Sequence, residues 1–142
     1  MKSMTYICFL FFISSFINVN GQGEVPASCG LDFSEVTFLQ SFEVNLDPAG
    51  KNDPPPIHRV AVILKKGTHY RFNICNADGS EGEGIIQLYD AGRLLGSTYN
   101  IATGKMYTGF DFICQKTSRY YIFISFKDGK GGQTVGVLSM VK

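Results

Sequence analysis

Apolar and polar residues alternate along most of this chain with the two-residue period of a β-strand. The clearest case is the segment in which Tyr120, Ile122, Ile124 and Phe126 share one face. Turns containing glycine or proline separate such segments, and no window shows the capped, three-turn apolar period of a helix. The pattern predicts strands at residues 36–44, 57–65, 69–75, 85–89, 93–99, 106–114, 119–126 and 133–141.

Short strands at even spacing favour an all-β fold. Because about eight strands fall within about 110 residues, we expect a two-sheet antiparallel β-sandwich of jelly-roll type. Alternation also assigns core positions. In the third strand it places Tyr70, Phe72 and Ile74 on one face, and in the sixth it places Phe110 and Phe112 on the face of Cys114.

The first 21 residues have the pattern of a signal peptide. Lys2 precedes an apolar stretch at residues 6–16, and residues 19–21 offer small side chains for cleavage. The stretch is shorter than the roughly 20 residues that a membrane-spanning helix needs. We therefore expect an exported protein that is periplasmic, outer-membrane-associated or extracellular. Its single β-sandwich domain would cover residues 22–142, with no transmembrane segment after cleavage.

Charges in the expected mature chain balance. The full chain has 13 basic and 12 acidic residues, so removal of Lys2 leaves 12 of each. Proteins that bind nucleic acid usually carry a net positive charge or a basic stripe. We therefore expect no nucleic-acid partner.

Three cysteines follow the signal peptide, in a compartment where disulfides persist. Cys75 and Cys114 each end a predicted strand, and this shared position favours a disulfide between them. Cys29 would then be free, buried or available to another chain. Residues 26–28 lie well past the apolar stretch and make a poor lipobox, which argues against lipidation of Cys29.

The residues offer little for catalysis. His58 and His69 lie in or at the start of predicted strands, and alternation gives neither an obvious carboxylate or serine partner. Glu81 and Glu83 lie on a glycine-rich loop, where the raised pKa of a general acid is hard to maintain. We see no metal-ligand spacing, nucleophile elbow or phosphate loop. We expect no enzyme activity, with a Cys29 nucleophile as the catalytic alternative.

The same glycine-rich loop could bind a cation. Asp78, Glu81 and Glu83 offer carboxylate oxygens, and the neighbouring glycines allow backbone carbonyls to turn inward. Calcium prefers such oxygen ligands, although the spacing is not that of an EF-hand. A solvated loop without metal is the interpretation that we favour, so we expect no cofactor, with calcium at these three residues as the alternative.

Aromatic residues mark a candidate binding surface. Tyr121 and Phe123 lie opposite the apolar face of their strand, and the further candidates for an outer face are Tyr89, Tyr99 and Tyr107. Exposed aromatic patches usually bind a partner, and tyrosine can contact a peptide or a sugar. The alternative is that these rings pack inside the protein.

Several segments in order resemble the bacterial prepeptidase C-terminal domain. They are residues 64–72, 86–90, 94–97, 110–112 and 118–122, and the resemblance spans about residues 57–142. That family is a small jelly-roll module found beside secreted peptidases and in other exported proteins. The N-terminal segment also resembles the signal peptides of Bacteroidota envelope proteins. The resemblance implies a fold and a compartment, and it leaves the role open because fold alone does not determine function.

Together these features favour a non-catalytic exported interaction module. We expect a small accessory subunit that docks on a larger bacterial envelope or secretion complex. The alternative is a stand-alone carbohydrate-binding jelly roll that uses the tyrosines and calcium.

Overall fold

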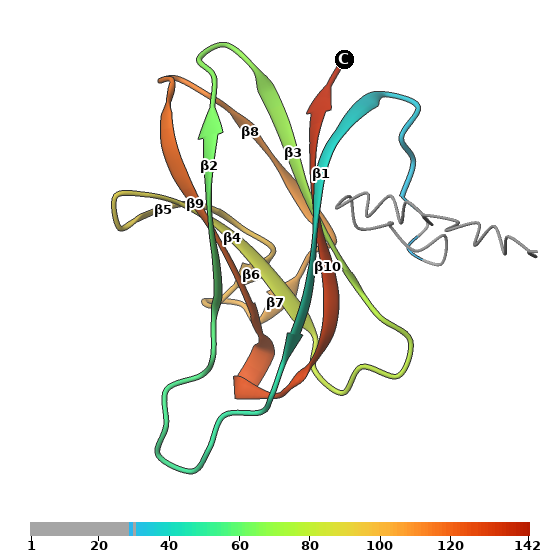
Figure 1. The fold of residues 1–142 in the computed structure, drawn as a ribbon, viewed down its shortest axis with the longest axis vertical. Helices are drawn as coiled ribbons and strands as arrows, with labels where there is room; N and C mark the ends of the chain where they lie inside the picture. The colour runs from blue at the N-terminus through green and yellow to red at the C-terminus, as the bar shows by residue number, and fades with distance from the viewer. Residues whose placement is uncertain (1–28, 30) are drawn as a thin grey trace, which may run out of the picture.

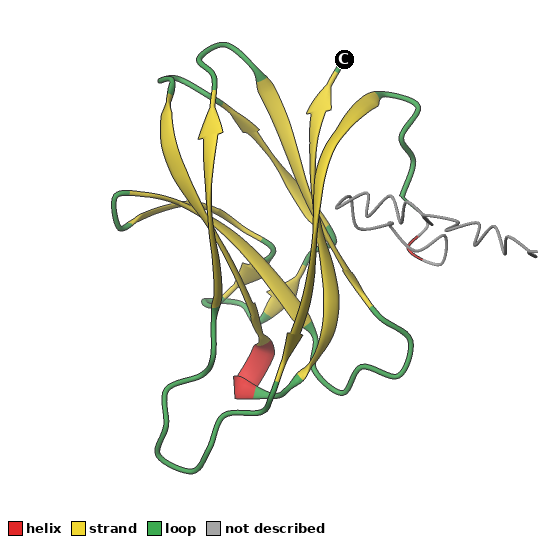
Figure 2. Cartoon of the chain, viewed as in Figure 1, coloured by secondary structure: helices red, strands yellow, loops and turns green. Residues whose placement is uncertain are grey.

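Two four-stranded antiparallel sheets face each other in the computed structural model of the chain, which describes residue 29 and residues 31–142 (Figure 1). The strands are β1 (Val36–Leu46), β2 (His58–Leu64), β3 (His69–Asn76), β4 (Gly84–Asp90), β5 (Arg93–Ser97), β6 (Tyr99–Asn100), β7 (Lys105–Met106), β8 (Gly109–Ile113), β9 (Ser118–Phe126) and β10 (Gly132–Val141). Sheet A has the order β1-β10-β3-β8 and sheet B the order β2-β9-β4-β5, while β6 and β7 form a separate short ribbon. One 3₁₀ turn, Lys127–Gly129, lies between β9 and β10 (Figure 2).

The strand order confirms the predicted jelly roll. Apart from the β6–β7 ribbon, every connection between successive strands crosses from one sheet to the other except the β4–β5 hairpin. Two sheets interleaved in this way form the double Greek key that defines a jelly roll.

The core lies between the sheets and contains the side chains that alternation assigned to it. Seven predicted core residues of β3 and β9 are each at most 7% exposed: Tyr70, Phe72, Ile74, Tyr120, Ile122, Ile124 and Phe126. Full burial of a large apolar side chain stabilises a fold by about 1.5–3 kcal/mol. These two strands are therefore a major source of the stability of the sandwich.

Two predicted strands are interrupted at Thr98 and near Thr108. Thr98 is buried, and its hydroxyl accepts a hydrogen bond from the Ile86 amide at 3.0 Å. The chain then turns through the ribbon β6–β7 before β8 begins at Gly109. Alternation continues across these breaks, so it did not reveal them.

A bulge in β1 breaks the alternation of its side chains between the two faces of sheet A. The register shifts between Phe38 and Gln40, so Phe38 pairs with Ser139 whereas Gln40 pairs with Leu138. Phe42 and Val44 therefore pack in the core, as Leu138 does, while Phe38 lies on the outer face of sheet A.

The predicted Cys75–Cys114 disulfide is wrong: Cys75 pairs with Cys29, with their Cα atoms 5.6 Å apart. The two predicted partners occupy opposite faces of sheet A. Cys75 alternates with the core residue Ile74 and so faces outward, whereas Cys114 is a free thiol buried in the core at 1% exposure. The two cysteines both lie at strand ends, but on opposite faces of the sheet, so they do not pair.

The segment before β1 is held across the outer face of sheet A. Cys29 bonds to β3, and the Phe33 ring lies 6.2 Å from the Phe38 ring of β1. Between those strands, the outward-facing Val135 and Val137 of β10 are only 7% and 0% exposed. The outer face of sheet A is therefore largely closed to solvent at its centre.

The predicted signal peptide, residues 1–21, lies outside the described residues, as does the start of the predicted domain. Within the described part of the chain, no helix is long and apolar enough to cross a membrane.

Candidate functional site

The outer face of sheet B carries one exposed aromatic residue, Tyr121, beside the half-buried Tyr89 and Phe123. In β9, Ile122 and Ile124 point into the core, so Tyr121 and Phe123 point away from it. Cross-strand pairing then places Ala61, Tyr121, Tyr89 and Leu94 in one row across all four strands of the sheet. Directly opposed residues of neighbouring strands lie on the same side of a sheet. We call Tyr89, Leu94, Tyr121 and Phe123 the aromatic face.

The rings of this face contact one another. The centroids of Tyr89 and Phe123 lie 4.6 Å apart with the rings tilted by 31°, and the Arg59 guanidinium lies 5.2 Å from the Phe123 centroid. Tyr121 is 37% exposed and Leu94 49%. Packing among their neighbours fixes the rings, while part of each apolar surface still meets solvent. A preformed surface of this kind loses little conformational entropy on binding.

Tyr99 and Tyr107, also predicted to bind, lie at the β6–β7 ribbon. The Lys127 ammonium lies 5.8 Å from the Tyr99 ring, and the Lys105 ammonium 5.1 Å from the Tyr107 ring. In the described part of the chain, no ring contact joins either tyrosine to the aromatic face. The structure thus brings together Tyr89, Tyr121 and Phe123 but not all five predicted residues.

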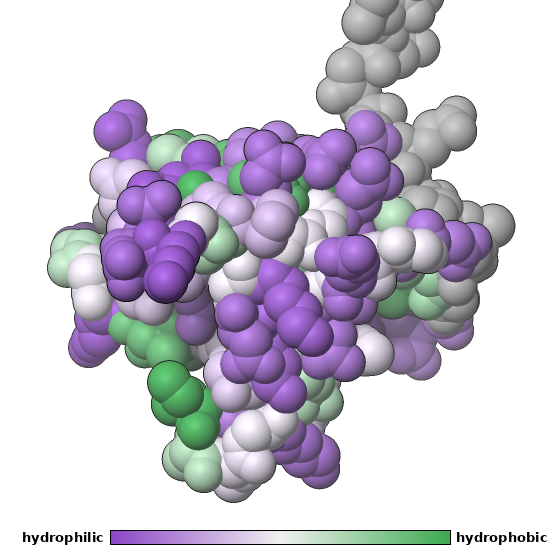
Figure 3. Space-filling model, turned by 90° about the horizontal axis from the view of Figure 1, so that it is seen from below, coloured by the Kyte–Doolittle hydropathy of each residue, from purple (hydrophilic) through white to green (hydrophobic). Residues whose placement is uncertain are grey.

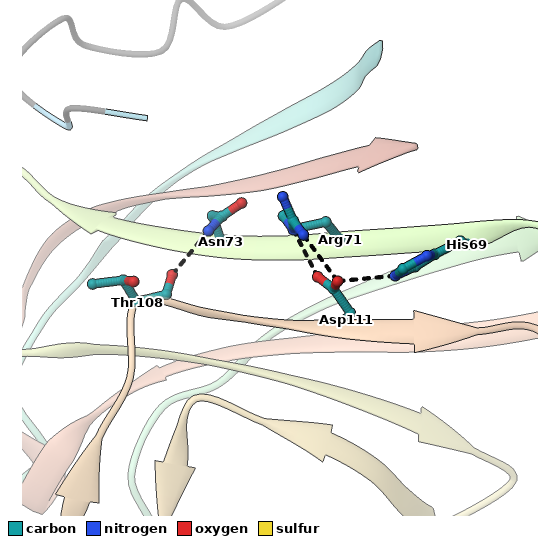
Figure 4. A network of polar contacts seen from close by, with 5 residues as sticks. All are labelled: His69, Arg71, Asn73, Thr108 and Asp111. Carbon is teal, nitrogen blue, oxygen red and sulfur yellow. Dashed lines mark hydrogen bonds and ion pairs between the residues drawn. The ribbon is translucent and has the colours of Figure 1, made fainter. Parts of the chain in front are cut away.

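A polar network on the outer face of sheet A was missed by the sequence analysis (Figure 4). Asp111 of β8 accepts two hydrogen bonds from Arg71, at 2.7 and 2.9 Å, and its second oxygen lies 2.9 Å from His69 Nε2. His69 therefore has a carboxylate partner, contrary to the prediction. The two-residue spacing of His69 and Arg71 already indicated that they share one face of a strand. Their contact with Asp111 could not be predicted, because it depends on the register of β3 and β8.

Charge pairing dominates this network. The Arg71 guanidinium, more than the weaker hydrogen bond from His69, holds the pKa of the Asp111 carboxyl below its ordinary value. Asp111 in turn raises the pKa of Arg71. Beside it, the Asn73 amide donates to the Thr108 carbonyl at 3.3 Å. These contacts tie the edge strand β8 to β3, which is a structural role.

The predicted calcium ligands do not converge. Asp78 and Glu81 line an open hollow between the β1, β3–β4 and β9–β10 segments, and Glu81 also lines a second hollow with Glu83, Lys127 and Lys130. Among the described residues, no group of three His, Cys, Asp or Glu side chains is placed to hold a metal ion. This loop end of the sandwich is largely hydrophilic (Figure 3). Calcium binding thus gains no support from the geometry.

In the described part of the chain, fold and surface together define a jelly-roll β-sandwich with a partly exposed aromatic face on sheet B. No family model matches the chain, and no curated protein matches its sequence. The resemblance to the prepeptidase C-terminal domain therefore remains a prediction.

A solved structure shares the fold: PliG from Aeromonas hydrophila, a periplasmic lysozyme inhibitor of g-type lysozyme. The TM-score is 0.50 at 9% identity, and the match covers 78% of this chain and 91% of that one. At this identity the likeness shows the fold alone.

Proposed function

We propose that this protein is a non-catalytic exported module that binds another protein through the aromatic face of sheet B. The observation that carries the proposal is the row of outward residues that crosses the whole sheet through Tyr121 and Tyr89. A contiguous exposed apolar patch on a soluble protein commonly marks an interaction site. Tyrosine and arginine are enriched in protein interfaces, and both are present here.

Two further observations support this proposal. The outer face of sheet A is largely closed around Val135 and Val137, so sheet B offers the more open apolar face. In addition, the structurally similar PliG is described as a periplasmic inhibitor of a lysozyme, which is a binding role for a protein of this fold. The finer proposal is that the partner belongs to a bacterial envelope or secretion complex, on which this chain acts as an accessory subunit.

The test is capture of the partner by the tagged protein from its native envelope and secreted fractions, followed by cross-linking and mass spectrometry. The tag belongs at the C-terminus, because the Lys142 amide donates to the Glu35 carbonyl at the end of sheet A, away from the aromatic face. We expect a stoichiometric protein partner whose capture falls at least about tenfold in Tyr121→Ala, as for an interface hot spot.

Tyr107→Ala is the matched control, because Tyr107 is 45% exposed and lies outside the aromatic face. It should leave capture unchanged. Equal capture by the Tyr121 variant, or recovery of the protein alone, would contradict the proposal.

Carbohydrate binding is the second candidate, and the Tyr89–Phe123 ring pair favours it because aromatic faces can stack on sugars. A glycan array, read with and without calcium, tests this candidate. Glycan binding that depends on Tyr121, with no protein captured, would replace the first proposal by the second.

A further inference from the structure

We infer that the partner of the aromatic face is an acidic protein surface, whose carboxylates pair with Arg59 and Arg119. This inference rests on the proposed function and specifies the chemistry of the partner.

Two of the four arginines in the chain have no carboxylate partner among the described residues. Arg71 is bound by Asp111, and Arg93 lies 3.9 Å from Asp90. Arg59 and Arg119, both exposed, make no ion pair with any described residue. Their positive charge is therefore available to another molecule.

Both unpaired arginines lie on the outer face of sheet B. Arg59 pairs with Phe123, and Arg119 precedes Tyr121 by two residues in β9, so both point to the side of the aromatic rings. A two-residue step along a strand is about 7 Å, which puts the two arginines about 14 Å apart along the strand direction. Tyr121 stands between them. The surface therefore presents an aromatic centre with a guanidinium on either side.

No carboxylate balances this charge on the outward face of the three strands that carry it. The outward positions of β2, β4 and β9 hold no aspartate or glutamate: they are Arg59, Ala61, Ile63, Ile85, Gln87, Tyr89, Arg119, Tyr121, Phe123 and Ser125. The full chain carries a formal net charge of only +1, so the positive charge of this face is a local excess. It would attract an acidic surface and oppose a basic one.

The chemistry of the face favours a protein over a glycan. Guanidinium forks bind carboxylates in a bidentate manner, and arginine and tyrosine together are typical of protein interfaces. Sugar hydroxyls also need strong acceptors, and the outward positions of β2, β4 and β9 provide no carboxylate to accept from them. Aspartate or glutamate beside apolar side chains is the matching pattern on a partner.

The experiment measures binding of the full mature chain to an immobilised random copolymer of glutamate and tyrosine. A lysine–tyrosine copolymer and polygalacturonate serve as comparison surfaces. We expect at least tenfold tighter binding to the glutamate copolymer than to the lysine copolymer. Because exposed charges are screened by salt, affinity should fall about tenfold between about 0.05 and 0.5 M salt.

Arg59→Glu and Arg119→Glu should each weaken binding to the glutamate copolymer about tenfold. Lys51→Glu is the matched control: it makes the same change in net charge at an exposed loop position between β1 and β2. It should stay within about twofold of the unmodified protein. Unchanged thermal unfolding of all three variants shows that the fold is intact.

Three results would overturn the inference: undiminished binding by both arginine variants, an equal loss in Lys51→Glu, or tighter binding to polygalacturonate than to the glutamate copolymer. The last result would indicate an anionic glycan. Partner capture distinguishes failure of the acidic-partner inference from failure of the proposed function. Capture that needs Tyr121 but tolerates both arginine variants refutes the acidic partner and leaves the proposed function standing. No capture through Tyr121 refutes the proposed function itself.

Discussion

Tyr120 links its strand, β9, to the β8–β9 connection through its hydroxyl. The ring is packed in the core, while the hydroxyl donates to the Lys116 carbonyl at 2.6 Å and lies 3.6 Å from the Cys114 thiol. Burial, followed by the contact with Cys114, raises the pKa of Tyr120 to about 12. The neutral phenol is therefore the form that the folded protein stabilises.

Alkaline pH should weaken the fold through this residue. The ordinary pKa of tyrosine is 10.0, and that of Tyr120 is raised in the folded state. Its contribution to stability is thus complete below pH 10 and is lost as the pH rises toward about 12. We expect ultraviolet titration to show a late-ionising tyrosine in the native protein.

Tyr120→Phe should remove that late step, whereas Tyr121→Phe, at an exposed ring, should keep it. Denaturant unfolding of the two variants at alkaline pH then shows whether the loss of stability comes from ionisation of Tyr120. If the late step persists in Tyr120→Phe, another tyrosine is responsible for it and Tyr120 is not the source of the alkaline instability.

At the scale of elements, Gly131 lets two loops meet closely. A Cβ atom at this position would lie 2.6 Å from the Pro48 nitrogen and 2.8 Å from the Leu46 carbonyl oxygen. These are backbone atoms at the end of β1, so they cannot withdraw as a flexible side chain can. The contact joins the β9–β10 connection to the β1–β2 loop.

We therefore expect Gly131→Ala to lower the free energy of unfolding by about 1–3 kcal/mol, the usual cost of overpacking. Gly50→Ala is the control, because the three atoms nearest to a Cβ atom there all belong to the Asp53 side chain, which can rotate away. Its effect should stay within about 0.5 kcal/mol. Urea unfolding of both variants provides the measurement, and equal stabilities would contradict the steric explanation.

The strand positions could be predicted from the sequence because they depend on a local pattern, the alternation of apolar and polar residues along one strand. In β3 and β9 each side chain alternates between core and surface, and the sequence shows this period directly. The bulge after Phe38 and the break at Thr98 depend on neighbouring strands, which no local pattern reports. The order of strands in each sheet also depends on contacts between strands far apart in the sequence, so it could not be derived from the sequence either.

The candidate site also contains residues that one strand's pattern predicts and residues that only strand pairing reveals. Tyr121 and Phe123 were found because alternation within one strand places them outside the core. Arg59 was missed as a neighbour of Phe123, because their contact depends on how β2 pairs with β9. For the cysteines, the alternation of β3 already separated Cys75 from the core face, but the shared position at strand ends outweighed it.

For the molecule as a whole, the Cys29–Cys75 disulfide links cysteines 46 residues apart. In the chain-entropy account, a loop of this size stabilises a fold by up to about 4 kcal/mol. We expect Cys29→Ser to lower the free energy of unfolding by up to that amount. Reduction of the unmodified protein should have the same effect and should leave Cys29→Ser unaffected.

Cys114→Ala is the control, because it removes the buried free thiol and keeps the disulfide. Its stability should still fall on reduction. Peptide mapping without reductant should recover a Cys29–Cys75 linked pair. A Cys29→Ser protein that still loses stability on reduction would instead indicate a second pairing, such as Cys75 with Cys114.

The most C-terminal strand of the fold lies inside a sheet. β10 sits between β1 and β3, so a nascent chain that has not reached Gly132 has no strand to join them. Sheet A, and with it one wall of the core, can therefore close only after β10 has been made. β1 pairs with β10 at the edge of this sheet, so the first strand of the fold has to wait for the most C-terminal one.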